Sequence, residues 1–206
     1  MNPLHLNQSD RVLVGPSTEP VLLTEAKAHL RVDSNDENSL ITALIVAARQ
    51  HCEQFTRRAF ITQTRRVSFN AFWGNESHGL VIPKPPLVSV QQIRYVDENR
   101  EWQTLASDRY AVITENDPGM VIPVDPTNAS EGTWPNTAPR VAAVQVDYTA
   151  GYGAASAVPQ PIKQAMLLLI GQYHEFRENV GSGTSFTEIP YAVKALLLPY
   201  SLPEAI

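Results

Sequence analysis

Hydrophobic residues near the start of the chain recur at helical spacing. The pattern predicts a first helix from Thr24 to about Val32, with Thr24 as its N-cap and Glu25 where a carboxylate favours the helix dipole. A second helix follows the turn at residues 33–36 and ends near Arg57 and Arg58. Its predicted apolar stripe, from which Arg49 is largely displaced, consists of Leu40, Ile41, Leu44, Ile45, Ala48, Cys52 and Phe55.

The middle of the chain instead has the composition of short strands. β-branched and aromatic residues lie between recurring prolines, and we predict strands at residues 61–69, 88–97, 102–105, 109–114 and 141–148. A turn at residues 97–100 joins the second of these strands to the third. Pro83, Pro85 and Pro86 should lie at a strand end, because proline cannot donate a hydrogen bond within a sheet. The pattern predicts a small antiparallel sheet or a sandwich.

Helical spacing returns at Pro159–Pro161, where a third helix opens. Its apolar face consists of Ile162, Ala165, Met166, Leu169, Ile170, Tyr173 and Phe176. We expect a loop at Gly181–Gly183 and a short last helix at about residues 191–198, before Pro199 and Pro203 break the chain. The order of elements predicts an α+β fold with a core of about four helices and an antiparallel β-rich subdomain inserted between the second and third.

These elements give a division into five parts. Residues 1–20 form an N-terminal extension, 21–58 and 151–200 the two parts of the helical core, 59–150 the β-rich insertion, and 201–206 a C-terminal tail.

The amino-acid composition excludes several classes of protein. The chain has 206 residues, of which 43% are hydrophobic, so it can bury a sizeable core. A single cysteine excludes a disulfide framework within the chain and a multi-cysteine zinc site. No apolar run approaches the ~18 residues of a membrane span, and no signal peptide is recognisable, so we expect a cytosolic protein with no membrane partner. The net charge of −5 disfavours general binding of DNA.

The most tempting reactive pair is His51 and Cys52, since histidine can activate a cysteine thiolate in a cysteine hydrolase. Consecutive side chains on a helix point about 100° apart, however, and Cys52 belongs to the apolar stripe. A buried structural cysteine is the better interpretation, and the hydrolase is a remote alternative. The segment Gly151–Gly153 lacks the third glycine of a dinucleotide-binding turn, so we predict a plain strand-to-helix turn and no cofactor.

Metal ligands are not grouped in the sequence. None of the five histidines forms a known zinc motif, and the acidic residues at 33, 36 and 37 are explained by helix capping. We therefore predict no metal site and no catalytic residues. The histidines are His5, His29, His51, His78 and His174.

Two features of the sequence could instead contact partners. The doublets Arg57–Arg58 and Arg65–Arg66 could meet a phosphate backbone or an acidic partner, or they could be solvated surface arginines. Trp73, Trp102 and Trp134 all lie in the β-rich middle. They could form a stacking platform of a free-standing module that binds a sugar or peptide, or they could be core residues.

A series of short blocks resembles the tailed-phage head–tail connector, or adaptor, proteins, in their longer type with a β-rich insertion. The first block is VLLTEAKAHLRVD at 21–33, and a later one is YTAGYG at 148–153. The remaining blocks are Asp36–Glu37, Leu40–Arg49, Glu53–Arg58, Thr62–Thr64, Ile82–Val90, Ile93–Asp97, Val158–Ala165, Glu175–Glu178 and Ile189–Tyr200. Each block is short, but their joint order is specific and covers most of the chain.

The resemblance implies a non-enzymatic structural protein of the virion neck, made in the bacterial host cytoplasm. Such connectors are monomers before assembly and then form a ring, commonly twelve-fold, beneath the portal protein. The implied partners are the portal, neighbouring copies, the next neck or tail component, and double-stranded DNA that passes without specific binding. The acidic charge fits a conduit, because binding DNA tightly requires neutralising its phosphates.

Within this interpretation, two sets of residues are candidates for contact. Arg57, Arg58, Arg65 and Arg66 are candidate channel-facing or partner-facing residues. Tyr200, Leu202 and Ile206 are candidate anchors of a docking tail, although the tail could instead cover the protein's own core.

Overall fold

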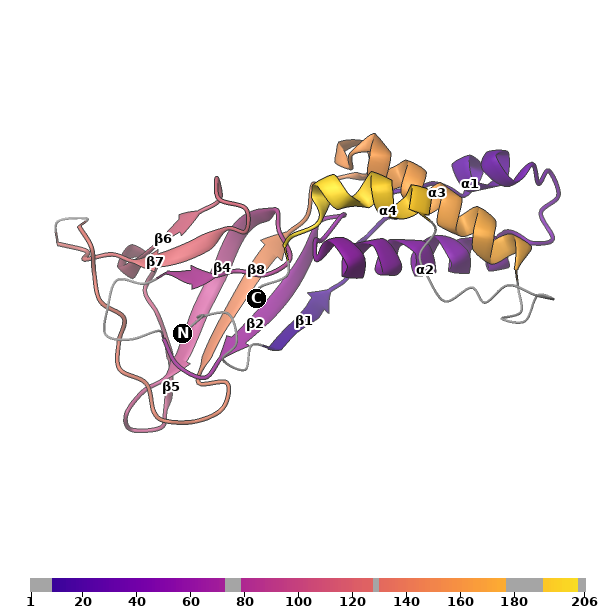
Figure 1. The fold of residues 1–206 in the computed structure, drawn as a ribbon. Helices are drawn as coiled ribbons and strands as arrows, with labels where there is room; N and C mark the ends of the chain where they lie inside the picture. The colour runs from indigo at the N-terminus through magenta and orange to yellow at the C-terminus, as the bar shows by residue number, and fades with distance from the viewer. Residues whose placement is uncertain (1–8, 73–78, 128–129, 177–190, 204–206) are drawn as a thin grey trace. The chain divides into compact units, whose positions relative to one another are not determined.

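The computed structural model describes residues 9–72, 79–127, 130–176 and 191–203 (Figure 1). The chain divides into two compact units. The helical unit contains the described residues of 16–61 and 152–203, and the β-rich unit contains the described residues of 9–15 and 62–151. The described part of the chain has four α-helices and two antiparallel sheets, with most strands between the second and third helices, which confirms the α+β prediction at that level. No helix in these ranges is long and apolar enough to cross a membrane.

The helices of the helical unit are α1 (Leu23–Leu30), α2 (Asn38–Thr56), α3 (Gln160–Glu175) and α4 (Tyr191–Leu197). Helix α2 packs along α3, while α1 and α4 each contact both of these helices (Figure 1). Short 3-10 turns are η3 (Ala155–Ala157) before α3 and η4 (Leu198–Tyr200) after α4. The fully buried core of this unit includes Ile41, Ile45, Ala48, Cys52, Phe60, Ile162, Met166, Leu169, Ile170, Val193 and Leu197.

Two local expectations for the helices need correction. Helix α1 is capped at Leu22 and not at Thr24, and the Glu25 carboxylate accepts a hydrogen bond from the Leu22 N–H at 2.7 Å. On α2, Leu40 and Leu44 are only partly buried. The buried face of α2 is turned around the helix axis relative to the predicted face. The residues on it also recur at helical spacing, and α2 packs against α1, α3 and α4. The residues of this buried face are Ile41, Ile45, Ala48, Arg49, Cys52, Glu53 and Thr56.

Helix α3 follows the sequence prediction closely. Pro159 is its N-cap, and Pro161 lies in the first turn, where a missing N–H costs nothing. The predicted apolar face is buried as far as Ile170, and Tyr173 is half-buried. Phe176 is exposed, because the helix ends at Glu175. The loop predicted at Gly181–Gly183 lies outside the described residues.

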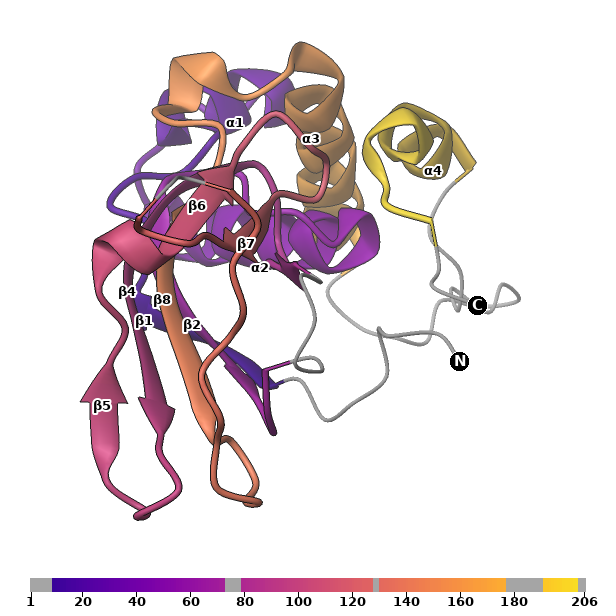
Figure 2. The ribbon, with the colours of Figure 1, turned by 90° about the vertical axis from the view of Figure 1, so that its left-hand side faces the viewer.

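The β-rich unit contains two antiparallel sheets (Figures 1 and 2). The larger has the strand order β1-β2-β8-β4-β5 and the smaller has the order β3-β7-β6. Their bounds are β1 (Ser9–Val14), β2 (Gln63–Phe69), β3 (Leu80–Val81), β4 (Leu87–Val96), β5 (Trp102–Thr104), β6 (Tyr110–Ile113), β7 (Met120–Pro123) and β8 (Val144–Ala150), with the 3-10 turn η2 (Ser107–Arg109) before β6.

Strands β2, β4, β5, β6 and β8 were predicted, whereas β1, β3 and β7 were not. The residues expected to form only an N-terminal extension include β1, which pairs with β2 along almost its whole length. The segment Ser9–Val14 lacks the alternation of a strand with one buried face, because most of its side chains are exposed. Pairing with a distant partner therefore makes it a strand.

Register divides the larger sheet into two faces. Val67, Val146 and Ile93 are paired across three strands and are fully buried, so this face belongs to the core. Arg66, Asp147 and Gln92 are paired across the same strands one residue along, so they occupy the opposite, polar face. Between β6 and β7, a side chain at Gly119 would approach Leu87 of β4 to 2.7 Å, so glycine is needed for the close contact there.

Candidate functional site

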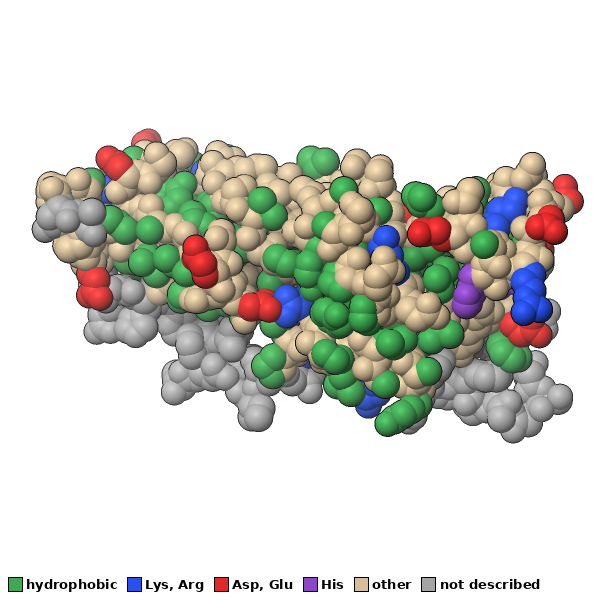
Figure 3. Space-filling view, turned by 90° about the horizontal axis from the view of Figure 1, so that it is seen from above, with side chains coloured by type: hydrophobic (Ala, Val, Ile, Leu, Met, Phe, Trp, Pro, Cys, Tyr) green, Lys and Arg blue, Asp and Glu red, His purple; other side chains and the backbone are tan. Residues whose placement is uncertain are grey.

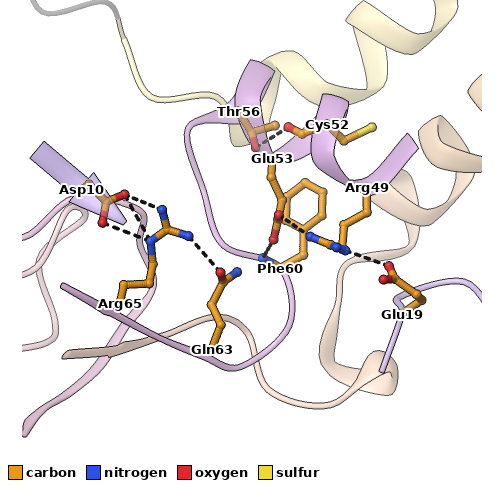
Figure 4. A network of polar contacts seen from close by, with 9 residues as sticks. All are labelled: Asp10, Glu19, Arg49, Cys52, Glu53, Thr56, Phe60, Gln63 and Arg65. Carbon is orange, nitrogen blue, oxygen red and sulfur yellow. Dashed lines mark hydrogen bonds and ion pairs between the residues drawn. The ribbon is translucent and has the colours of Figure 1, made fainter. Parts of the chain in front are cut away.

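A buried ion network joins three segments of the helical unit (Figure 4). The Arg49 guanidinium on α2 lies 2.7 Å from a Glu19 carboxylate oxygen and 2.8 Å from Glu53. The other oxygen of Glu53 accepts a hydrogen bond from the Phe60 N–H at 2.8 Å. Arg49 was expected to lie largely off the buried stripe, which is wrong, because its side chain is only 9% exposed. The network holds the segment before α1 and the segment after α2 against α2.

The charge of Arg49 is retained in this network. Burial by itself lowers the pKa of the guanidinium, but its hydrogen bonds and ion pairs with Glu19 and Glu53 raise the pKa above its ordinary value. A buried charge that keeps its partners is tolerated, whereas one that loses them is costly. The arrangement therefore has the character of a structural tie.

Cys52 does not have the surroundings of a nucleophile. The residue is fully buried, and burial, with the charge of Glu53, raises the pKa of its thiol to about 12. The neighbouring His51 is hydrogen-bonded to the hydroxyl of Tyr173, with 3.0 Å between Nδ1 and the oxygen. The thiolate is the reactive form of cysteine, so this site is poorly suited to hydrolase chemistry.

We predict that iodoacetamide will not label Cys52 in the native protein at pH 8. The thiol is both inaccessible and protonated there, and labelling should become complete only after unfolding in guanidinium chloride. Mass spectrometry of the intact chain checks this result. Rapid stoichiometric labelling without denaturant would show that the thiol is reactive in the folded protein.

Strand β1 is fastened to its sheet by a second polar cluster (Figure 4). Arg65 on β2 forms a bidentate ion pair with Asp10 on β1, with 2.5 Å between Nη2 and Oδ2. Arg65 also donates to Gln63 at 2.8 Å, and the Tyr148 hydroxyl donates to Asp10 at 2.9 Å. Tyr148 is fully buried, and burial raises the pKa of its hydroxyl. Arg65 therefore has a clear structural partner within its own unit.

Arg66 points to the polar face of the same sheet. It forms a bidentate ion pair with Asp147 on β8, with 2.7 Å between Nη2 and Oδ2, and Gln92 donates to the same carboxylate oxygen at 2.7 Å. Burial raises the pKa of Asp147, but the hydrogen bonds from Arg66 and Gln92 and the charges of Arg66 and Arg94 outweigh it. The net pKa is lowered.

The lowered pKa of Asp147 predicts a stabilising contribution that depends on pH. A carboxyl group whose pKa is lower in the folded than in the unfolded state stabilises the fold fully above its unfolded value, here 3.8, and loses this effect as pH falls through the folded value. Asp147→Asn should therefore lower the melting temperature at pH 7, and the difference from the unchanged protein should shrink below about pH 4. Calorimetry from pH 2 to 7 tests this, and a difference independent of pH would contradict it.

Arg57 and Arg58 lie at the end of α2, beside the last described residues of the chain. Arg57 adopts a left-handed conformation as the C-cap and donates to the Pro203 carbonyl oxygen at 3.4 Å. Arg58 is buried and donates to the Tyr200 carbonyl oxygen, and the Leu202 N–H donates to the Thr56 carbonyl oxygen at 3.2 Å. Tyr200 packs on the helical core, and Ile206 lies outside the described residues.

The four arginines singled out from the sequence thus belong to two separate places, one pair in each unit. Their role toward a channel or partner stays a prediction, as does the docking role of the tail. The intramolecular contacts of Arg58, Arg65 and Arg66 were not visible in the sequence, because their partners lie far away along the chain.

The tryptophans and histidines do not form a common site in the described ranges. Trp134 is buried and stacks on Phe72 with 4.7 Å between ring centroids, as expected for a core residue. Trp102 is partly exposed, and the guanidiniums of Arg94 and Arg140 lie over its ring at 5.2 and 5.5 Å. Trp73, His5 and His78 lie outside the described residues. Among the residues that the structure covers, no cluster of three His, Cys, Asp or Glu side chains could hold a metal ion.

The described clusters therefore tie segments of a structural protein together, and comparison with known proteins identifies its class. Residues 21–121 match the phage gp6-like head–tail connector family. By this segment the chain is similar to a family of non-enzymatic structural proteins, the head–tail connectors of phages. A comparison with curated protein sequences finds no match.

Solved structures share the fold over nearly the whole chain. A chain in the neck of an empty gene transfer agent (GTA) particle, computed with C6 symmetry, has a TM-score of 0.74 and 22% identity, covering 96% of this chain and 97% of that one. A chain in the virion of the native GTA particle has a TM-score of 0.72 with the same identity and coverage. A chain in the native neck, computed with C12 symmetry, has a TM-score of 0.63 and 22% identity, with 97% of both chains covered.

Proposed function

We propose that the chain forms a closed ring in the neck of a phage or phage-like particle. The ring joins the portal to the next neck or tail component and extends the channel through which DNA leaves. The observation that supports this most strongly is the structural similarity to neck chains, which covers 96–97% of this chain and 97% of each of those chains. The similarity therefore extends well beyond residues 21–121, the segment that matches the family. Those neck structures were computed with C6 and C12 symmetry, which supports twelve copies in the ring.

The charge distribution supports a conduit more than a DNA-binding protein. The net charge is −5, and Arg49, Arg65 and Arg66 are each paired with a carboxylate in their own unit. Phosphate binding requires basic groups that are available to release counterions from DNA. The proposed partners are therefore the portal, neighbouring copies and the next neck or tail component, with DNA passing without specific binding.

The proposal is tested by mixing the purified chain with the portal protein of its own particle. We expect the chain alone to be mainly monomeric and a stable complex of about one copy per portal subunit to form on mixing. Size-exclusion chromatography with light scattering measures both masses. The proposal would be contradicted if the chain, added in excess at micromolar concentration and low salt, did not co-elute with intact portal rings.

A further inference from the structure

Strand β1 is an exposed edge strand of the larger sheet. It pairs with β2 on one side, and no strand among the described residues pairs with its other side. Three consecutive apolar residues on it are exposed: Val12 by 48%, Leu13 by 40% and Val14 by 62%. Exposed apolar edges offer unpaired backbone donors and acceptors to another extended chain, and proteins usually protect them. The occupant that fits β1 is therefore an apolar extended strand.

The chain itself has such a strand at a second edge. Strand β6, Tyr110–Ile113, is the end strand of the smaller sheet, pairs only with β7 among the described strands, and consists of half-buried apolar residues. Figure 1 shows β1 and β6 at opposite sides of the β-rich unit. Two different edges on opposite sides are the requirement for a head-to-tail contact, in which each copy uses one edge toward each neighbour.

The remaining edge of the larger sheet is a poorer partner. Strand β5 has only three residues, and its Trp102 lies beneath the guanidiniums of Arg94 and Arg140. Short edges and nearby charged side chains are typical protection against strand addition. Figure 3 shows further hydrophobic side chains scattered over one face of the molecule. The exposed apolar residues of the helical unit include Leu22, Tyr191 and Leu198, which do not lie on strands.

We propose that β1 of one copy adds to β6 of a second copy and forms the subunit contact of the ring. The inference rests on the proposed function, because a ring requires each copy to use both edges and to close the series of contacts. The apolar residues Val12–Val14 lie alongside the apolar residues Ala111–Ile113 in the contact, and backbone hydrogen bonds join the two sheets. Pairing of β1 with another β1 would instead use one edge twice and stop at a dimer.

The proposal is tested by placing one cysteine on each edge and adding a short bismaleimide. Val12→Cys and Ala111→Cys are small changes at an exposed and a half-buried position. Cys52 should not react with the bismaleimide in the folded protein, since it is fully buried and the pKa of its thiol is raised to about 12. The double variant should give covalent dimers, trimers and larger multiples under ring-forming conditions with the portal, whereas each single variant should stay monomeric on a denaturing gel.

The matched control combines Ala111→Cys with Val141→Cys. Val141 is 72% exposed and lies outside the strands, so this pair should give no ladder. If the first double variant does not fold, Val14→Cys combined with Ala111→Cys replaces it as the test of the same two edges. Circular dichroism shows which variants are folded.

The possible outcomes distinguish failure of the β1–β6 contact from failure of the proposed function. Rings seen by electron microscopy without a ladder from either edge pair would overturn the β1–β6 contact and leave the ring intact. Dimers from Val12→Cys alone would overturn it in favour of β1–β1 pairing. Failure of the unchanged chain to form rings on its portal would contradict the proposed function itself, while a ladder formed in free solution would still support strand addition.

Discussion

Replacing Arg49 with leucine is expected to lower the free energy of unfolding of the helical unit by about 3–5 kcal/mol. The change leaves the Glu53 carboxylate buried beside an apolar side chain, although this carboxylate still accepts the Phe60 N–H. Glu19 loses its partner as well, but it is more exposed and water can solvate it. Chemical denaturation followed by circular dichroism at 222 nm measures the loss, because the signal comes mainly from the helices.

A double variant distinguishes the ion pair from general packing. Arg49→Leu combined with Glu53→Leu removes both charges, so the remaining loss should fall to about 1–3 kcal/mol, the cost of leaving the Phe60 N–H without its carboxylate acceptor. Arg31→Leu is the surface control, since Arg31 is an exposed C-cap residue of α1. Equal losses from Arg49→Leu and Arg31→Leu would show that the network contributes nothing to stability.

Truncation of Phe60 to alanine should cost about 3–5 kcal/mol, from lost burial and the cavity left behind. The phenyl ring is fully buried in the helical core, with its centroid 6.5 Å from that of the Tyr152 ring. Its backbone is fixed on both sides, because its N–H donates to Glu53 and its carbonyl oxygen accepts from the Tyr152 N–H. The surroundings should therefore relax only partly into the cavity.

The comparison for this prediction is Tyr191→Ala, which removes an aromatic side chain that is 86% exposed in the same unit. We expect it to change the free energy of unfolding by less than about 0.5 kcal/mol. Parallel denaturation of the two variants gives the difference directly. A loss below about 1 kcal/mol for Phe60→Ala would mean that the site collapses around the smaller side chain.

Helix α3 and strands β2, β4 and β8 could be predicted from the sequence because local spacing and burial agree in them. The buried positions of α3 recur at helical spacing, and a proline marks its first turn. The central strands have apolar residues on the core face and polar residues on the other. Strand β1 could not be predicted, because its side chains are mostly exposed and its partner β2 lies on the far side of two helices in the sequence.

The polar clusters show a second limit of sequence patterns. A helical wheel places Arg49 away from the apolar stripe but contains no information about Glu19, which reaches it from another segment. Arg65 and Arg66 look like one basic doublet, yet successive residues of a strand point to opposite faces. One therefore pairs with Asp10 and the other with Asp147, and the doublet is not a single charged patch.

Electron cryomicroscopy of the chain assembled with its portal tests the central claim most directly. We predict a closed ring with one well-ordered layer of this chain on the portal, a continuous axial channel, and density for both the helical and the β-rich unit in every copy. A reconstruction that shows scattered single copies on the portal surface, or a layer that blocks the axis, would contradict a connector that extends the DNA channel.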